Sequence, residues 1–151
     1  MILEPYAVQD FLIMMAFTGL SAVAMQEGRS FMSGKIGQQI VDPRVSIWDD
    51  GQDLRGLPLP FDFEGVPKQR VDLIKEGVAT GVVYDSYRAG KEEGKSSTGH
   101  ALPAPSTFGP FPMNAFFGPG DATLEEMISS TERGLYVTRF HYTRPVEPTQ
   151  V

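Results

Sequence analysis

The sequence contains no cysteine, and its 151 residues include only two histidines and one tryptophan. Without cysteine the chain can form no disulfide, no iron–sulfur cluster and no zinc site with thiolate ligands. This composition fits the reducing cytoplasm, and we expect a cytoplasmic protein. The two histidines, His100 and His141, are far apart, and neither has a metal-binding neighbour at helical spacing. The residues by themselves therefore predict no metal site in this chain.

Positive charge is also scarce. The chain has 13 lysines and arginines against 19 acidic residues, which gives a net charge of −6. A nucleic-acid backbone is bound by a basic face, so we expect no direct contact with nucleic acid. The most apolar stretch, residues 11–25, is shorter than the roughly 20 residues that span a bilayer, and no basic segment precedes it. We therefore expect neither a membrane span nor a signal peptide.

Two stretches have helical patterns. Apolar residues are almost continuous over residues 7–26, which predicts one long buried helix with Pro5 in its first turn. Residues 123–131 predict a second, short helix, because Thr123 and Glu126 have the spacing of a capping box.

Outside these stretches, turn signals separate short apolar runs that predict strands. The strongest signal is Glu76-Gly77, a two-residue hairpin loop in which Gly77 takes a positive φ. The predicted strands cover residues 1–3, 45–48, 66–75, 78–84 and 135–140. Two helices and several mostly hairpin-connected strands predict an α+β fold with an antiparallel or mixed sheet.

The length and the apolar fraction of 41% predict a single domain over residues 1–151. Glycine and proline are frequent in residues 89–121, and a loop of this length is usually functional or becomes ordered against a partner. The chain begins within a predicted strand, and residues 148–151 stop where another strand would begin. Unpaired strands recruit other chains, so we expect a segment of a longer protein that self-associates through open edges.

One group of charged residues is a candidate for acid–base chemistry. Asp62 and Glu64 would share a face if residues 61–65 are extended, and Arg70 could then return to neutralise them. Such a cluster can fix a loop or take part in catalysis; both interpretations stay open, and the structural one is preferred. Hydroxyl residues precede His100, but no nucleophile-elbow motif accompanies them.

Several motifs follow one another in a fixed order along most of the chain. They include Phe61-Asp62-Phe63-Glu64-Gly65, the Glu76-Gly77 hairpin and Ser97-Thr98-Gly99-His100, and they cover residues 61–70, 73–78, 84–87, 95–100 and 133–140. This series resembles the TldD/PmbA family, whose members are also described as modulators of DNA gyrase. The resemblance implies a PmbA/TldD-like α+β fold and a peptidase system that degrades or matures small peptides.

The resemblance also implies two kinds of subunit. A TldD-type subunit carries a zinc-binding His-Glu-x-x-x-His helix, and a PmbA-type (TldE-type) subunit pairs with it and lacks that motif. Counting back from Ser33-Gly34, the motif would fall at Ile13, Met14 and Thr18, and none of these side chains can serve as the motif requires. The resemblance is therefore to the PmbA type, with no catalytic residue and no metal in this chain and zinc only in a TldD-type partner.

We therefore expect the non-catalytic partner subunit of a zinc metallopeptidase, which holds an extended peptide on an exposed strand edge. The residues expected to contact the peptide or the partner are Asp62, Glu64, Arg70, Ser97, Thr98, Gly99 and His100. Two alternatives stay open. An active metallopeptidase would hold its metal on the two histidines with Asp62 or Glu64. A regulator of DNA gyrase would follow the family's historical label.

Overall fold

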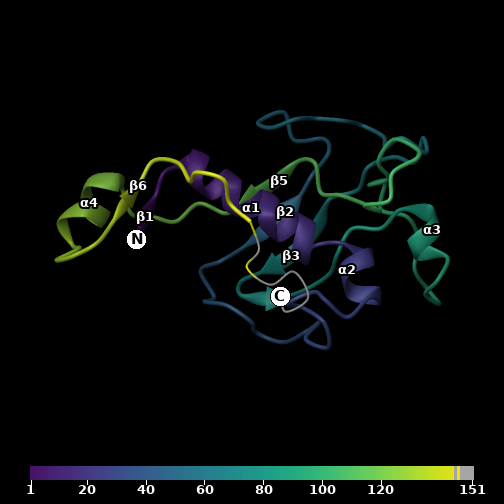
Figure 1. Ribbon diagram of the computed structural model, residues 1–151, viewed down its shortest axis with the longest axis horizontal. Helices are drawn as coiled ribbons and strands as arrows, with labels where there is room; N and C mark the ends of the chain where they lie inside the picture. The colour runs from purple at the N-terminus through teal and green to yellow at the C-terminus, as the bar shows by residue number, and fades with distance from the viewer. Residues whose placement is uncertain (145, 147–151) are drawn as a thin grey trace.

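The computed structural model describes residues 1–144 and residue 146. Its centre is a four-stranded sheet with the order β4-β3-β2-β5, in which all three pairings are antiparallel (Figure 1). The strands are β2 (Ile47–Asp49), β3 (Val71–Lys75), β4 (Val78–Ala79) and β5 (Ala115–Phe117). The predicted α+β fold with an antiparallel sheet is confirmed.

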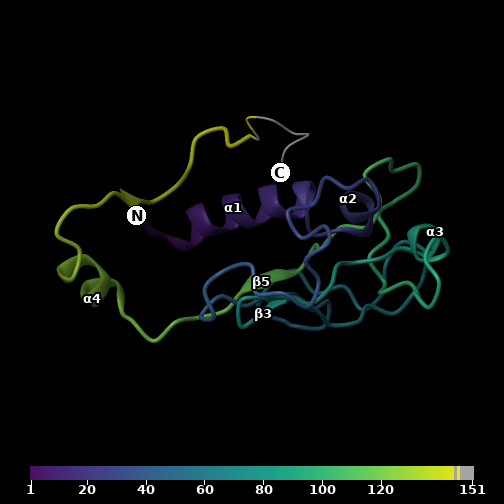
Figure 2. The same ribbon diagram turned by 90° about the horizontal axis from the view of Figure 1, so that it is seen from below.

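Four helices occur in the described part of the chain. They are α1 (Pro5–Thr18), α2 (Ala22–Gln26), α3 (Ser86–Ala89) and α4 (Leu124–Ser129). α1 lies along one face of the sheet, and α2 continues beyond its C-terminal end (Figure 2). α3 is missing from the sequence-based prediction because one helical turn is too short to show a periodic pattern. None of the described helices has the length and hydropathy needed to cross a bilayer.

The prediction of one helix over residues 7–26 is wrong, because the chain leaves the helical path between α1 and α2. Gly19 is the C-cap of α1, and a Cβ at this position would collide with the Phe31 ring. The next residues extend toward the sheet, so that the Ala22 N–H donates to the Val83 carbonyl (3.0 Å). These two contacts come from distant parts of the sequence, which is why local hydrophobicity does not reveal the break.

The prediction that this N-terminal helix is buried is also wrong. Within α1, the buried residues are Ala7 and Ala16, whereas the exposed fractions of Tyr6 and Phe11 are 68% and 49%. The sheet covers one side of the helix, and the described residues leave much of the other side open (Figure 2).

The predicted hairpin at Glu76-Gly77 is confirmed. These two residues have φ values of 50° and 81°, as a two-residue type I′ turn requires. The flanking strands are shorter than the predicted 66–75 and 78–84, because the ladder between β3 and β4 has only the pairs Ile74–Ala79 and Lys75–Val78.

Residues 89–121 do not form one long loop, contrary to the sequence-based expectation. β5 lies within this segment, and His100, Pro110 and Asn114 are buried. The longest continuously exposed stretch within it is short and covers residues 103–108. Most of the segment is therefore part of the packed structure.

A second, two-stranded sheet joins the N-terminus to the C-terminal part of the chain. β1 (Ile2–Leu3) pairs in parallel with β6 (Tyr136–Val137). The arm that holds α4 and β6 lies beside the N-terminal end of α1, away from the four-stranded sheet (Figures 1 and 2). Thr123 and Glu126 form the predicted capping box at the start of α4. The strand start expected at residues 148–151 lies outside the described residues.

The hydrophobic core fills the space between the sheet and the junction of α1 with α2. The pairing register between β2 and β3 shifts between Ile47 and Trp48. Next to this shift, the consecutive β3 residues Leu73 and Ile74 are both fully buried. The largest buried apolar side chains of the core are Leu20, Met32, Ile47, Leu73, Ile74 and Val83. This core fixes the position of the four-stranded sheet.

We predict that Gly77→Ala destabilises the fold more than Gly94→Ala. Both glycines have a positive φ, which costs an alanine about 1–2 kcal/mol. At Gly77 the new Cβ would also lie 2.6 Å from the Val41 carbonyl oxygen, whereas nothing lies within 4 Å of it at Gly94. Gly77→Ala should therefore lower the free energy of unfolding by roughly a further 1–3 kcal/mol. Urea unfolding of the two variants measures the difference, and equal losses would contradict the described packing of the hairpin.

Candidate functional site

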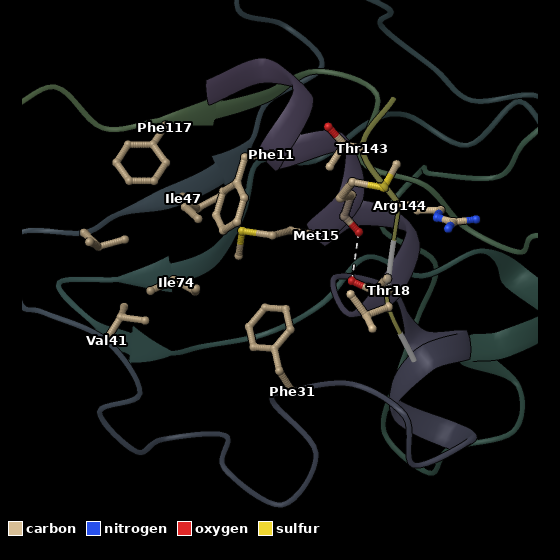
Figure 3. Close-up of a pocket in the computed structure, with 13 residues that line it drawn as sticks. Phe11, Met15, Thr18, Phe31, Val41, Ile47, Ile74, Phe117, Thr143 and Arg144 are labelled. Atoms are coloured by element: carbon tan, nitrogen blue, oxygen red, sulfur yellow. Dashed lines mark hydrogen bonds between the residues drawn. The ribbon is translucent and has the colours of Figure 1, made fainter. Parts of the chain in front are cut away.

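A groove opens between α1 and the sheet (Figure 3). Its volume is about 850 Å³. α1 contributes Phe11, Met14, Met15 and Thr18, which share one helix face. The sheet and the loops before β2 contribute Phe31, Val41, Val45, Ile47, Ile74 and Phe117, and the rim carries Thr143, Arg144 and Val146. The groove is therefore walled almost entirely by apolar side chains.

The three positions where the family's zinc motif would fall do not converge on one site. Met14 and Thr18 line the groove, whereas Ile13 lines a second hollow, of about 1050 Å³, that α1 shares with β5 and α4. Side chains five residues apart on an α-helix point about 140° away from each other, so residues 13 and 18 diverge. The Thr18 hydroxyl donates to the Met14 carbonyl within the helix (2.8 Å). These positions form part of an apolar wall.

The second candidate site is a buried polar cluster beneath residues 97–101. The His100 ring is hydrogen-bonded through Nε2 to Asp49 Oδ1 (2.8 Å) and through Nδ1 to the Thr98 hydroxyl (2.9 Å). The other Asp49 oxygen accepts the backbone N–H of Asn114 (2.7 Å). The exposed fractions of His100 and Asp49 are 1% and 0%. A single carboxylate thus connects β2, the 97–101 segment and the residue that precedes β5.

Lys68 brings a positive charge into the same cluster. Its side chain is 2% exposed, and its Nζ lies 4.0 Å from Asp49 Oδ1. This Nζ has no hydrogen-bond partner among the described residues. The lysine stem packs on Gly51, where a Cβ would collide with it. Burial lowers the pKa of Lys68, and the carboxylates of Asp49 and Asp62 oppose that shift without cancelling it.

Asp62 holds two segments together. One of its oxygens accepts the backbone N–H groups of Glu64 and Val66 (both 2.9 Å), and the other accepts the N–H of Ala101 (2.9 Å). The expectation that residues 61–65 are extended is therefore wrong. An aspartate that accepts an N–H two residues ahead folds the chain into a turn, so Asp62 and Glu64 do not share a face.

Glu64 and Arg70 also point elsewhere than predicted. Glu64 is exposed and accepts the backbone N–H of Ser86, at the start of α3 (3.0 Å). The Arg70 guanidinium lies 3.1 Å from the Asp72 carboxylate and 4.8 Å from the centre of the Trp48 ring. The expectation that Arg70 neutralises the two carboxylates is therefore wrong. Its own neighbours on the sheet supply both a nearer anion and an aromatic face.

The remaining predicted residues fix the path of the 97–101 segment. The Ser97 hydroxyl accepts the N–H of Gly99 (3.2 Å), and the Thr98 hydroxyl accepts the N–H of Tyr84 (2.8 Å). Gly99 has a φ of 76°, and a Cβ there would lie 2.5 Å from the Pro67 carbonyl oxygen. Only glycine therefore lets this segment lie directly on the backbone that leads into β3.

The order of Thr98, His100 and Asp49 is that of a hydroxyl–imidazole–carboxylate triad, but each group already has a structural partner. The Thr98 hydroxyl accepts the amide of Tyr84 and lies 3.1 Å from the Tyr84 carbonyl oxygen. A nucleophile and its base must reach a substrate atom, and this imidazole is buried under the segment that carries it. The arrangement locks the segment onto the sheet.

The ligands of the alternative metal site do not come together. His100 uses both ring nitrogens within the buried cluster, and His141 is exposed. Over residues 1–144 and 146, no group of three or more His, Cys, Asp or Glu side chains is arranged to hold a metal ion. This part of the chain offers no set of donors that zinc requires.

The central residues of the cluster, Asp49 and Lys68, are absent from the sequence-based site. The pair Asp49-Asp50 reads as a solvated turn, although Asp49 lies two residues after the buried Ile47 and therefore on the inward face of β2. That alternation is the signal that identifies Asp49. No comparable signal distinguishes Lys68 from a surface lysine, because its burial depends on contacts with distant residues.

We predict that Lys68→Met stabilises the fold at pH 7, by about 1 kcal/mol or more, because burial of the ammonium, which has no hydrogen-bond partner among the described residues, outweighs its attraction to Asp49 and Asp62. The gain should shrink as the pH approaches 10.5, the ordinary pKa of lysine. Between the lowered pKa of the folded state and that value, the unfolded chain alone holds the proton, so the stability of the parent protein rises with pH.

Urea unfolding at pH 7 and pH 10 measures this gain, with Lys75→Met as the control at an exposed lysine of β3. The control should change stability by less than about 0.5 kcal/mol at either pH. A gain for Lys68→Met that is the same at both pH values would contradict the lowered pKa.

Comparison with known proteins places the whole chain in one family. The family model described as "PmbA/TldA metallopeptidase C-terminal domain" matches residues 1–151. The chain is 33% identical over 126 residues to the Metalloprotease TldD homolog of Haemophilus influenzae. This alignment covers 81% of this chain and 26% of that protein. It is 40% identical over 73 residues to the Metalloprotease PmbA of Escherichia coli O157:H7, which covers 48% of this chain and 16% of that protein.

Solved structures share the fold. TldE from Thermococcus kodakarensis superimposes with a TM-score of 0.82 at 25% identity, over 97% of this chain and 34% of that one. A Thermotoga maritima protein described as a "putative modulator of a DNA gyrase" gives a TM-score of 0.79 at 31% identity, over 91% of this chain and 31% of that one. The matched residues thus span between 16% and 34% of the length of these relatives. It belongs to the PmbA/TldD metallopeptidase family.

Proposed function

We propose that this chain is a segment of the non-catalytic, PmbA-type subunit of a zinc metallopeptidase that degrades or matures small peptides in the cytoplasm. The zinc and the catalytic groups belong to a TldD-type subunit, with which this subunit forms a heterodimer. The observation that carries the proposal is the occupancy of the three zinc-motif positions on α1 by Ile13, Met14 and Thr18.

These three side chains lack the chemistry of the motif. Zinc in such a helix needs imidazole nitrogens and a carboxylate that exchanges a proton with water. Ile13 and Met14 have no lone pair suited to a hard or borderline metal and no exchangeable proton, and the Thr18 hydroxyl is engaged with the Met14 carbonyl. A substrate bound near α1 would therefore meet no hydrolytic group at these three positions.

The two outer strands of the sheet differ in how they are covered. At β4, the Ala79 carbonyl accepts the N–H of Gly37 (2.7 Å) and the Ala79 N–H donates to Gln38 (3.0 Å), so residues 37–40 occupy that side. β5 is the other end of the strand order, and no further strand of the described chain pairs beyond it. We infer that β5 is the edge that holds an extended peptide.

The register of β5 identifies which backbone groups face the peptide. Gly118 donates to the Ser46 carbonyl and Asp50 donates to the Asn114 carbonyl, so these residues bond to β2 or its extensions. In an antiparallel ladder the bonded and non-bonded residues alternate. The N–H and C=O groups of Ala115 therefore point away from β2, toward the open edge.

The residues expected to touch the peptide or the partner divide into two groups. Glu64 and Arg70 are exposed and can contact a partner directly. Asp62 and His100 are buried, so in this proposal they act by holding the loops in place. Ser97, Thr98 and Gly99 complete the segment that these buried groups anchor.

A second candidate is an active metallopeptidase, which the names of both the TldD and PmbA relatives favour. It would need metal donors from outside the described residues of this chain. Regulation of a DNA gyrase rests on names alone, such as the one given to the Thermotoga maritima protein. A net charge of −6 over 151 residues is too small to imitate a nucleic acid and gives that function no support.

We predict that the tagged chain, co-expressed with a TldD-type subunit, retains that subunit on the affinity resin. Zinc should be found in the complex and not in this chain purified alone, because its α1 lacks the motif ligands. Metal analysis of both preparations measures this, with an unrelated acidic protein of similar size as the bait control. Stoichiometric zinc on the isolated chain would support the metallopeptidase alternative, and failure to retain the subunit would contradict the proposed pairing.

A further prediction concerns peptide binding at β5. Ala115→Pro removes one outward N–H, so the KM of the complex for a short unstructured peptide should rise about three- to tenfold. Ala115→Val keeps the N–H and should leave KM near that of the parent complex. Circular dichroism checks that both variants fold. Equal KM values for the two variants would show that β5 is not the peptide edge.

A further inference from the structure

A stack of cationic and aromatic side chains crosses the sheet on the face opposite α1. Trp48 of β2 and Phe116 of β5 are paired residues, and their rings lie 5.8 Å apart and 18° from parallel. The Arg70 guanidinium lies 4.8 Å from the centre of the Trp48 ring. The Arg55 guanidinium lies 5.3 Å from the centre of the Phe116 ring. Ile47, which precedes Trp48, lines the groove beside α1, so the alternation along β2 places the stack on the other face.

Arg55 lies where the stack meets β5, beside the edge that we propose for the peptide. It lines the same hollow, of about 1050 Å³, as all three residues of β5. Its side chain is 71% exposed, although its guanidinium lies over Phe116. The loop that carries it is held against β5, because the Leu57 N–H donates to the Asn114 side chain (2.6 Å). A strand added to β5 would therefore pass this guanidinium.

The register of β5 identifies which peptide residue would lie nearest to Arg55. The backbone groups of Ala115 point to the open edge, so in the alternating pattern those of Phe116 bond to β2. With an antiparallel peptide, Phe116 therefore forms a non-hydrogen-bonded pair, the kind in which the two side chains lie closest. The peptide side chain of this pair lies on the same face as the Phe116 ring, next to Arg55.

The surroundings of the Arg55 guanidinium favour an aromatic ring over an anion. The Asp53 carboxylate already accepts hydrogen bonds from Nε (2.9 Å) and from Nη2, so the charge is paired along one edge. An acidic side chain beside Arg55 would be repelled by this carboxylate. The planar faces take no part in these bonds, and an aromatic ring is attracted to such a face through its π electrons.

We propose that Arg55 selects peptides with an aromatic side chain at the position paired with Phe116. The ring would extend the stack beyond the sheet by one member. This inference rests on the proposed peptide edge at β5 and adds the class of substrate. Backbone hydrogen bonds along β5 would hold a peptide of any sequence, whereas Arg55 discriminates among sequences.

Steady-state kinetics of the complex with the TldD-type subunit test the proposal. The substrates are short peptides that are identical except at one position, which carries phenylalanine, leucine or glutamate and is moved along the peptide. At one position the phenylalanine peptide should have a KM about two- to fivefold below that of the leucine peptide, with the glutamate peptide highest. The kcat values of the phenylalanine and leucine peptides should agree, because the stack is the same in the ground and transition states.

Arg55→Gln should remove this preference, and Arg55→Lys, which keeps a cation, should retain more of it. Arg44→Gln is the matched control. Arg44 forms the same two-bond pair with an aspartate two residues earlier, Asp42, but lies outside the hollow at β5. It should leave the preference unchanged.

Equal KM values for phenylalanine and leucine at every position would overturn the selection. So would a preference that persists in Arg55→Gln, or a lowest KM for the glutamate peptide, which would mean that the guanidinium binds anions. Ala115→Pro separates this inference from the peptide edge itself. If it raises the KM of all the peptides relative to Ala115→Val, the edge stands whether or not a preference is found. If it does not, the edge and the selection fail together.

Discussion

The buried carboxylate of Asp49 is the interaction on which the rest of this structure depends. It is fully inaccessible to solvent, so leaving either oxygen without a hydrogen-bond partner would cost several kcal/mol of free energy. Its partners are the His100 ring and the backbone N–H of Asn114, which lie 51 and 65 residues away along the chain. The residue before β5 is therefore held against β2, and the His100 segment is held against both.

Asn114, whose backbone N–H binds this carboxylate, extends the hydrogen-bond network through its side chain. Its amide donates to the carbonyls of Asp50 and Asp53 (2.6 and 3.1 Å), and its oxygen accepts the N–H of Leu57 (2.6 Å). A proline- and glycine-rich stretch without secondary structure of its own is thereby fixed in place. Several hydrogen bonds of the Asp49 network therefore hold loops, whereas the core between the sheet and the helix junction is apolar.

Sequence reasoning succeeded where the signal is local. The Glu76-Gly77 turn and the Thr123–Glu126 capping box each depend on residues within one turn, and both are present. It failed where distant residues decide. The helix break at Gly19 depends on Phe31, and the direction of Arg70 depends on Trp48 across the sheet. The buried cluster was found in part, because its motif residues stand out in sequence, whereas Lys68 and Asn114 resemble surface residues until the fold is known.

α1 also carries apolar side chains on the side that the described residues leave exposed. A helix with apolar residues on all sides is typical of the interior of a larger protein, and the relatives are about three times as long as this chain. Had the zinc-motif positions of α1 carried imidazole and carboxylate groups, those groups would need either a metal or solvent around them. With Ile13, Met14 and Thr18 in their place, the helix can lie against apolar surface on both sides. Two of these three residues, Met14 and Thr18, also line the apolar groove, whereas Ile13 faces the second hollow.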